Sequence, residues 1–424
     1  MQCILESTHS RDAGLMKGEL AVKHTANFRR FVVLLFAGLA CLSSTACAPL
    51  SRGPAVPADL EEQTIMPGMP GVRFWGDEST PAMLAEAQAN IAREKAYLAS
   101  TGFTGALPPV NFLAISGGGE NGAFGAGLLV GWSKAGTRPV FKGVTGISTG
   151  ALTAPFAFLG PAYDDKLREI YTTLSAKDVL TENGMLAGVL FEDAFADNTP
   201  LQKTVAKYFD QKMLDAIGDE YNKGRLLLIG TTNLDARRPV IWNIGQIAIS
   251  GNPGALALVH KILVASAAIP GAFPPMMIDV EANGKQYEEM HVDGGAASQV
   301  FVYPPAFNLS KSNVKRERHL YVIRNARLDP NWAQVSRSTF SIASRAIDSM
   351  IQTQGVGDLY RIYATSQRDD IEFNLAFIPS SFTRELKEPF ETAYMNDLFK
   401  VGFDMAVEGY PWAKAPPGFD APVK

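Results

Sequence analysis

Cysteine is scarce in this chain of 424 residues, which contains three. All three, Cys3, Cys41 and Cys47, lie before residue 48. A disulfide framework and a thiolate metal site are therefore excluded from the body of the protein. Histidine is also sparse, with five residues, and none stands in the H-E-x-x-H spacing typical of a zinc enzyme. The sequence predicts neither a metal nor a cofactor.

Runs of basic residues, internal repeats and low-complexity tracts are absent too. The chain has 39 Lys and Arg against 43 Asp and Glu, which gives a formal net charge of -4. Nucleic acid is not expected as a partner, because its binding needs clustered positive charge. With 46% hydrophobic and 19% charged residues the composition is that of a globular protein.

The N-terminal region has the pattern of an export signal. Lys23, Arg29 and Arg30 precede a short apolar run over residues 31–42, and small residues follow it. The run is shorter than the roughly 20 residues that a membrane span requires, and its basic flank favours a signal peptide over a buried helix. We therefore expect residues 1–46 to be a signal peptide and the protein to be exported from a bacterial cell.

Two ways of cleaving this signal peptide are open. Cleavage before Cys47 would give a lipoprotein, since the site resembles a bacterial lipobox with Ser44 where leucine is usual. Alternatively, Ala46-Cys47-Ala48 fits an A-x-A site for ordinary secretion. A lone cysteine at the cleavage point favours lipid attachment at Cys47. The expected location is thus a periplasm-facing membrane surface, or otherwise the periplasm or the medium.

Apolar periodicity divides the rest of the chain. We expect a tether and a helix over residues 47–106, a catalytic domain over 107–380, and a C-terminal helical extension packed on it over 381–424. Strands are predicted at 110–115, 141–145, 225–232, 238–243, 289–292, 320–323 and 371–378, and helices at 81–100, 122–134, 151–159, 164–174, 200–216, 254–267, 338–354 and 390–407. This alternation predicts a three-layer α/β/α fold with a mostly parallel central sheet.

Two glycine-rich turns follow the first two strands of that domain. The first contains Gly117, Gly118, Gly119 and Gly122 and leads into a helix, so its backbone N–H groups could hold a negative charge. Its G-x-G-x-x-G pattern is also found in dinucleotide-binding folds, which need an acidic residue about 20 positions later. No Asp or Glu occurs between Glu120 and Asp164, so the dinucleotide interpretation fails.

The second turn is a G-x-S-x-G motif formed by Gly146, Ser148 and Gly150. In this motif a serine hydroxyl is exposed on a sharp turn between a strand and a helix, where flanking side chains would clash. A tight turn with a serine that caps the following helix would have the same sequence pattern. The preceding strand, the following helix and the nearby anion-binding turn favour a nucleophile for acyl transfer.

A serine nucleophile needs a base, and histidine is the usual one. His260 lies in an apolar helix, His291 lies beside Asp293, and His319 starts a strand among charged residues. A triad of Ser148, Asp293 and His319 is one open interpretation. Asp293, in an Asp-Gly-Gly sequence at a strand end, could also be a simple turn former.

These blocks together resemble the patatin-like phospholipases. The similarity lies in the first glycine turn, the G-x-S-x-G turn, the Asp293-Gly294-Gly295 block and the segment 265–275, and it extends over about 107–305. The resemblance implies a patatin-like fold and a Ser–Asp dyad without histidine, with Ser148 as nucleophile and Asp293 as proton acceptor. It further implies an oxyanion hole made by the amides around Gly117, Gly118 and Gly119, supported by Gly122, Gly146, Gly150, Gly294 and Gly295.

The predicted function is a serine acyl hydrolase that cleaves carboxylic esters of lipids, either phospholipids or lysophospholipids. The alternatives are a carboxylesterase or acyltransferase on another acyl group, and an inactive envelope lipoprotein that serves as a scaffold. Family members often carry Arg or Lys at the position of Asn121, which leaves the preference for a phosphate headgroup open. The apolar segment 186–195 is predicted to form an interfacial cover over the site.

Overall fold

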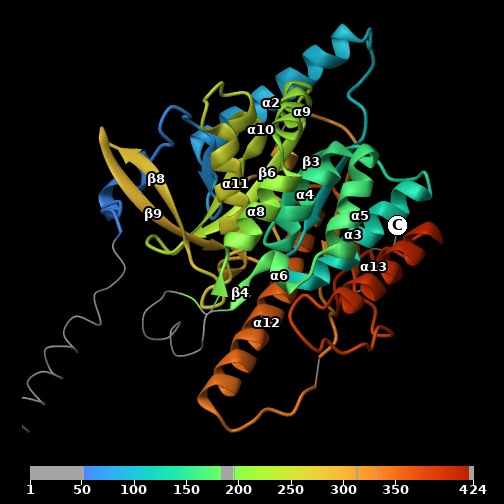
Figure 1. Ribbon diagram of the computed structural model, residues 1–424. Helices are drawn as coiled ribbons and strands as arrows, with labels where there is room; N and C mark the ends of the chain where they lie inside the picture. Colours follow the sequence, from blue (N-terminus) through green and yellow to red (C-terminus); the bar gives the residue numbers. More distant parts are fainter. Residues whose placement is uncertain (1–51, 183–193, 195, 312–313, 331, 420–424) are drawn as a thin grey trace, which may run out of the picture.

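The computed structural model describes residues 52–182, 194, 196–311, 314–330 and 332–419 (Figure 1). The predicted signal peptide and Cys47 lie outside the described residues, as does all of the segment 186–195 except Ala194.

Five parallel strands form the centre of the main sheet. They are β2 (Val110–Ile115), β3 (Phe141–Gly146), β6 (Leu226–Asn233), β10 (Arg318–Arg324) and β11 (Glu372–Phe377), in the spatial order β6-β3-β2-β10-β11. Their central residues are apolar and buried because helices cover both faces, as is usual for parallel sheets. The predicted mixed α/β fold with a mostly parallel sheet is confirmed.

Four antiparallel strands extend this centre. Strand β7 (Arg238–Asn243) pairs with β6, and β1 (Arg73–Trp75) pairs with β7. A hairpin of β8 (Met276–Ala282) and β9 (Lys285–Asp293) completes the sheet, and β9 pairs with the end of β6.

The pairing along β6 changes partner halfway. Its first half pairs with β3, ending at Gly146 opposite Ile229, and its second half pairs with β9, where Thr231 is opposite Asp293. Strand β9 therefore occupies the place beside β6 that β3 leaves when it turns at Gly146. This exchange brings the ends of strands β3 and β9, more than a hundred residues apart in sequence, to one point of the sheet.

Helices form a layer on each face. The larger layer contains α3 (Gly122–Lys134), α4 (Thr149–Leu159), α5 (Asp164–Thr173), α8 (Thr199–Tyr208), α9 (Gln211–Asn222), α10 (Ile244–Ala248), α11 (Ala255–Ser266) and α13 (Thr392–Val407). On the opposite face, the C-terminal half of α12 (Thr339–Arg368) packs on β10 and β11 through Leu359, Ile362 and Tyr363. Helix α2 (Pro81–Ser100) lies beside α9, with the Asn90 amide donating to Gly224 O.

Helix α13 packs unusually closely against α3. A side chain at Gly127 of α3 would overlap the backbone of Phe399, and one at Gly402 of α13 would overlap the backbone of Phe124. The absence of Cβ atoms at these positions lets the two helix backbones touch. The C-terminal helix is thereby fixed beside the first glycine turn, where the Tyr394 hydroxyl donates to Asn121 Oδ1 at 2.7 Å.

Three predicted elements differ from the structure. The tether expected over residues 49–76 is wrong for its last residues, since Val72, Phe74 and Trp75 are buried and β1 joins the sheet. The single helix predicted at 200–216 is two, because the Asp210 carboxylate caps a new helix by accepting from Met213 N. Strand β8 was not predicted, and α12 continues to Arg368 rather than ending at 354.

Among the described residues, no helix combines the length and apolar character needed to cross a bilayer.

Candidate active site

Ser148 lies on a strained turn between β3 and α4. Its backbone has φ 56° and ψ −128°, a region that residues with a side chain rarely occupy. A Cβ atom at Gly146 would overlap the backbone of Gly150, and one at Gly150 would overlap the carbonyl of Ile115. Both glycines are therefore required by close backbone approach, as the G-x-S-x-G motif predicts.

Asp293 ends strand β9 and lies close to this turn. One carboxylate oxygen, Oδ1, accepts the amide of Gly295 at 2.7 Å. The other oxygen, Oδ2, is buried and has no hydrogen-bond partner among the described residues. A Cβ atom at Gly294 would lie only 2.6 Å from Gly230 O, so the turn after Asp293 is held tightly against the end of β6.

The surroundings of Asp293 change its acidity. Burial raises the pKa of its carboxyl to about 7, because an ionised carboxylate is poorly solvated in this site. The approach of the Ser148 hydroxyl and the Gly295 amide oppose that rise. A carboxyl with this pKa is about half ionised at neutral pH, and its ionised form is basic enough to accept a proton from a hydroxyl during reaction.

The first glycine turn faces Ser148 but differs in one respect from the predicted oxyanion hole. The Gly117 amide donates to Gln299 O at 3.0 Å, so it is occupied, and its predicted role is corrected. The amides of Gly118 and Gly119 have no acceptor within the described part of the chain. A Cβ at Gly122 would overlap the Thr149 side chain, which shows how closely the starts of α3 and α4 approach.

Asn325, which the sequence analysis did not single out, fixes this turn from the end of β10. Its backbone amide donates to Ser116 Oγ at 2.8 Å and its side-chain amide to Ser116 O at 3.0 Å. Its Oδ1 accepts from Gly125 N at 3.1 Å, within the first turn of α3. The only sequence signal was a polar residue directly after an apolar strand.

Ser266 is a second residue that the sequence did not reveal. Its hydroxyl accepts the amide of Ser148 at 3.0 Å and donates to Gly230 O at 2.7 Å. Two residues later, Ala268 O accepts the amide of Asp293 at 2.9 Å. The end of α11 therefore contacts both Ser148 and Asp293, which gives the segment 265–275 a structural purpose.

The histidines lie elsewhere. His319 is opposite Asn111 at the start of β2, while Ser148 follows the end of β3, so the triad with His319 is wrong. Both ring nitrogens of His291 are engaged, with Glu289 and Thr231 at 2.9 Å each, and burial lowers its pKa. His260 is bonded to Phe209 O at 2.7 Å.

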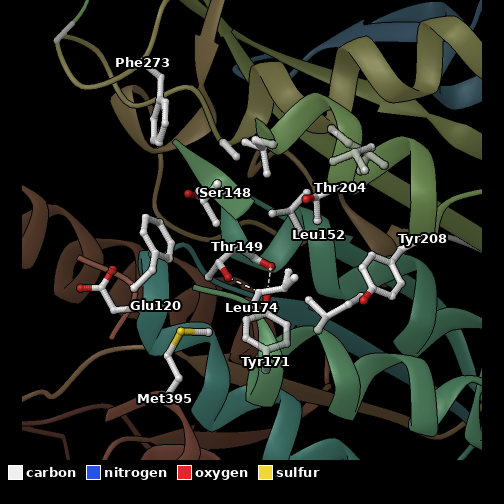
Figure 2. A pocket seen from close by; sticks show the side chains of 18 of the residues that line it. Glu120, Ser148, Thr149, Leu152, Tyr171, Leu174, Thr204, Tyr208, Phe273 and Met395 are labelled. Atoms are coloured by element: carbon white, nitrogen blue, oxygen red, sulfur yellow. Dashed lines mark hydrogen bonds between the residues drawn. The ribbon is translucent and has the colours of Figure 1, made fainter. Parts of the chain in front are cut away.

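An apolar pocket opens beside Ser148 (Figure 2). Its wall is almost entirely apolar and is formed by α4, α5, α8, α11 and the start of α13, with Leu152, Phe156, Leu174, Val205, Leu263 and Phe273 among its side chains. Such a lining suits a hydrocarbon chain.

One carboxylate and one amide directly follow the glycine triplet. Glu120 lines the pocket next to the first glycine turn, and burial raises the pKa of its carboxyl. The neighbouring Asn121 side chain is bound to the Tyr394 hydroxyl. The positions directly after the glycine triplet thus supply no positive charge.

Residues 113–305 match the model of the patatin-like phospholipase family. This domain belongs to the patatin-like phospholipases. The match includes Ser148, Asp293 and both glycine turns, and family membership supports activity as a lipid acyl hydrolase. No curated protein matches the chain by sequence.

The chain is also similar to solved structures. They include VipD from Legionella pneumophila, with TM-score 0.34 and 12% identity over 71% of this chain and 67% of that one. Human GIVD cytosolic phospholipase A2 has TM-score 0.30 and 10% identity over 66% and 51% of the two chains. ExoU of Pseudomonas aeruginosa, in complex with SpcU, has TM-score 0.30 and 12% identity over 72% and 52%. The chain spans about half the length of the last two proteins.

Proposed function

We propose that this patatin-like domain is a serine acyl hydrolase of lipid esters, with Ser148 as nucleophile and Asp293 as its base. The observation that carries the proposal is the buried Asp293 carboxylate beside Ser148, with its Oδ2 unbonded to any described residue and its pKa raised to about 7. The strained backbone of Ser148 supports it, since such strain is concentrated at functional sites.

In the proposed acylation step, the Ser148 hydroxyl attacks the carbonyl carbon of the ester while its proton passes to Asp293 Oδ2. The carbonyl oxygen becomes an oxyanion that the Gly118 and Gly119 amides stabilise, an effect worth about 3–4 kcal/mol for a well-placed donor. The C–O bond of the ester then breaks. Asp293 returns the proton to the leaving alkoxide, which departs as an alcohol and leaves an acyl-serine.

Deacylation repeats the sequence with water as the nucleophile. Asp293 accepts a proton from water as its oxygen attacks the acyl-serine, and the same amides hold the second oxyanion. When the Ser148–acyl bond breaks, the proton goes from Asp293 to Ser148 Oγ and the fatty acid is released. An alcohol in place of water would give acyl transfer, which keeps the acyltransferase alternative open.

The lining of the pocket supports a preference among esters. The apolar wall suits the acyl chain, while Glu120 and Asn121 lie where a basic residue would attract a phosphate. A carboxylate at this position repels an anionic headgroup. We therefore favour esters with neutral or zwitterionic headgroups over anionic phospholipids as substrates. Replacing Glu120 by Gln should raise the rate on anionic lipid relative to zwitterionic lipid.

A fluorophosphonate probe tests the nucleophile directly. The wild-type protein should be labelled, Ser148→Ala should not be, and Asp293→Asn should be labelled at least about 100-fold more slowly. Ser366→Ala is the matched control, because Ser366 is also buried and its hydroxyl donates to Ile362 O within α12, away from Ser148. A folded wild type that stays unlabelled would contradict the enzyme proposal and favour the scaffold lipoprotein.

Export and lipid attachment at Cys47 remain proposals that rest on the sequence. Incorporation of radiolabelled fatty acid into the wild type, and its loss in Cys47→Ser, would support the anchor. Secretion of an unmodified protein cleaved near Ala48 would support the ordinary signal instead.

A further inference from the structure

The N-terminal half of α12 has an apolar face that none of the described residues covers. Ile342, Ile347 and Met350 are 55%, 49% and 64% exposed, and Ala343, Ala346 and Ile351 are exposed with them. At 100° per residue these six positions fall on one side of the helix. Ser341, Ser344, Arg345 and Asp348 fall on the other side. This segment, residues 341–351, is called the projecting half of α12 below.

Figure 1 shows this half extending alone beyond the body of the molecule, on the side where α6 (Ala176–Val179) lies. Val179 of α6 lines the pocket beside Ser148. A short distance before α12 stands Trp332, whose side chain is 85% exposed. A projecting amphipathic helix with an exposed tryptophan is shaped to enter a flat apolar layer rather than to fill a groove.

The other half of α12 is bonded to the candidate active site. Asp358 accepts the amide of Gln299 at 2.6 Å and the hydroxyl of Ser298 at 3.0 Å. The Gln299 side chain donates to Gly295 O at 2.9 Å and to Gln354 Oε1 at 3.0 Å. One continuous helix thus runs from the loop that follows Asp293 to the exposed apolar face.

We propose that the projecting half of α12, together with Trp332, docks on a lipid–water interface and holds the pocket at that surface. The proposal rests on the proposed function, because it assumes that the substrate is drawn from a lipid surface. Helices with one apolar and one polar face bind in the plane of such interfaces with the apolar face buried among acyl chains. Tryptophan favours the headgroup level, where its ring is apolar and its N–H stays hydrated. The continuity of the helix with the Asp293 loop favours a lipid surface over a protein partner.

The experiment uses the full chain with Ser148→Ala and Cys47→Ser, so that neither turnover nor a lipid anchor contributes to binding. Vesicles of phosphatidylcholine and phosphatidylglycerol are the probe. We expect the protein to sediment with the vesicles and its tryptophan emission to shift to shorter wavelength. Trp332→Phe should abolish the shift, since Trp75, Trp132 and Trp242 are buried and Trp412 is half-buried against the Trp132 ring.

Ile347→Ser with Met350→Ser should weaken vesicle binding about tenfold or more. Placed in the active chain with Cys47→Ser, the same pair should slow turnover of vesicular lipid similarly while leaving turnover of a soluble short-chain ester unchanged. Val140→Ser is the matched control, because Val140 is 74% exposed on the loop before β3 and should affect neither assay.

The proposal would be overturned if the double variant bound vesicles as tightly as the parent protein. It would also be overturned if the protein formed a dimer that this variant dissociates, because the apolar face would then belong to a contact with a second copy. These outcomes are separable from a failure of the proposed function, since fluorophosphonate labelling and soluble-ester turnover report on Ser148 and Asp293 without any lipid surface.

Discussion

The amide of Ser148 donates a hydrogen bond of 3.0 Å to the hydroxyl of Ser266, a residue 118 positions later in the chain. The same hydroxyl donates to Gly230 O, so it ties the turn of Ser148 to strand β6. Since β6 also pairs with the end of β9, the Ser266 side chain fixes Ser148 relative to the strands that position Asp293. Ser266 is therefore a positioning residue, and it touches neither the substrate pocket nor the carboxylate.

Ser266→Ala should lower kcat on a soluble ester about 10- to 100-fold with little change in KM. The substitution leaves the Ser148 amide buried without an acceptor, which costs about 1–3 kcal/mol, and frees the strained turn to relax. Steady-state kinetics with Ser366→Ala as control separates this from a general loss of packing. An unchanged kcat in Ser266→Ala would show that the glycines hold the turn without help.

The rate should depend on pH through Asp293. The base must be ionised to accept the serine proton, and its pKa is raised to about 7, so its active form is lost as the pH falls below about 7. We expect kcat/KM on a neutral ester to decrease about tenfold per pH unit on the acid side. A profile that stays flat down to about pH 5 would contradict the assignment of Asp293 as the base.

The burial of Asp293 also predicts that the stability of the fold decreases with rising pH, whereas the rate increases. The folded-state pKa of Asp293 is above the ordinary aspartate value of 3.8, so the folded protein binds this proton more tightly than the unfolded chain. The stabilisation from that proton is complete below about pH 4 and is lost as the pH rises through about 7. Asp293→Asn does not titrate and should gain in relative stability over this range.

Urea unfolding at about pH 5 and pH 8 measures this difference. The free energy of unfolding of Asp293→Asn minus that of the wild type should increase between these two pH values, by at most about 3 kcal/mol, because the proton is lost between about pH 5 and about pH 7. Equal differences at the two pH values would mean that Asp293 is better solvated than its burial implies.

Asn325→Asp tests the support of the first glycine turn. The new carboxylate would face Ser116 O instead of donating to it, and it would add negative charge near the Gly118 and Gly119 amides. We expect kcat to fall about 100-fold. Asn374→Asp is the matched control, since Asn374 is also buried and donates to Leu320 O, but Lys414 lies beside it to balance the charge.

Thermal unfolding completes that comparison. Both Asp variants should melt at lower temperature, because each loses a buried hydrogen bond. Only Asn325→Asp should lose kcat. A parallel loss of kcat in both variants would reduce the role of Asn325 to general stability.

The sequence was sufficient for what depends on near neighbours. The strand-to-helix turn at Ser148 could be predicted from its motif, because the clash that requires Gly146 arises within the turn itself. The clash that requires Gly150 is different, since it involves the carbonyl of Ile115 on the neighbouring strand. The alternation of buried strands and amphipathic helices likewise predicted the mostly parallel sheet. The helix break at Asp210 was missed, since an apolar period continues across a capping residue.

The tertiary structure decided what depends on partners far apart in the chain. Asp293 lies beside the turn of Ser148 because β9 replaces β3 along β6, where Asp293 pairs with Thr231. No local sequence pattern specifies this register. The same pairing leaves His319 at the opposite end of the strands. The surfaces that meet on folding also decide whether an amide is already bonded, as at Gly117. They decide in the same way whether an apolar helix face is buried, as along α12. Local sterics fix a turn, whereas hydrogen bonding and burial are completed only by the packed chain.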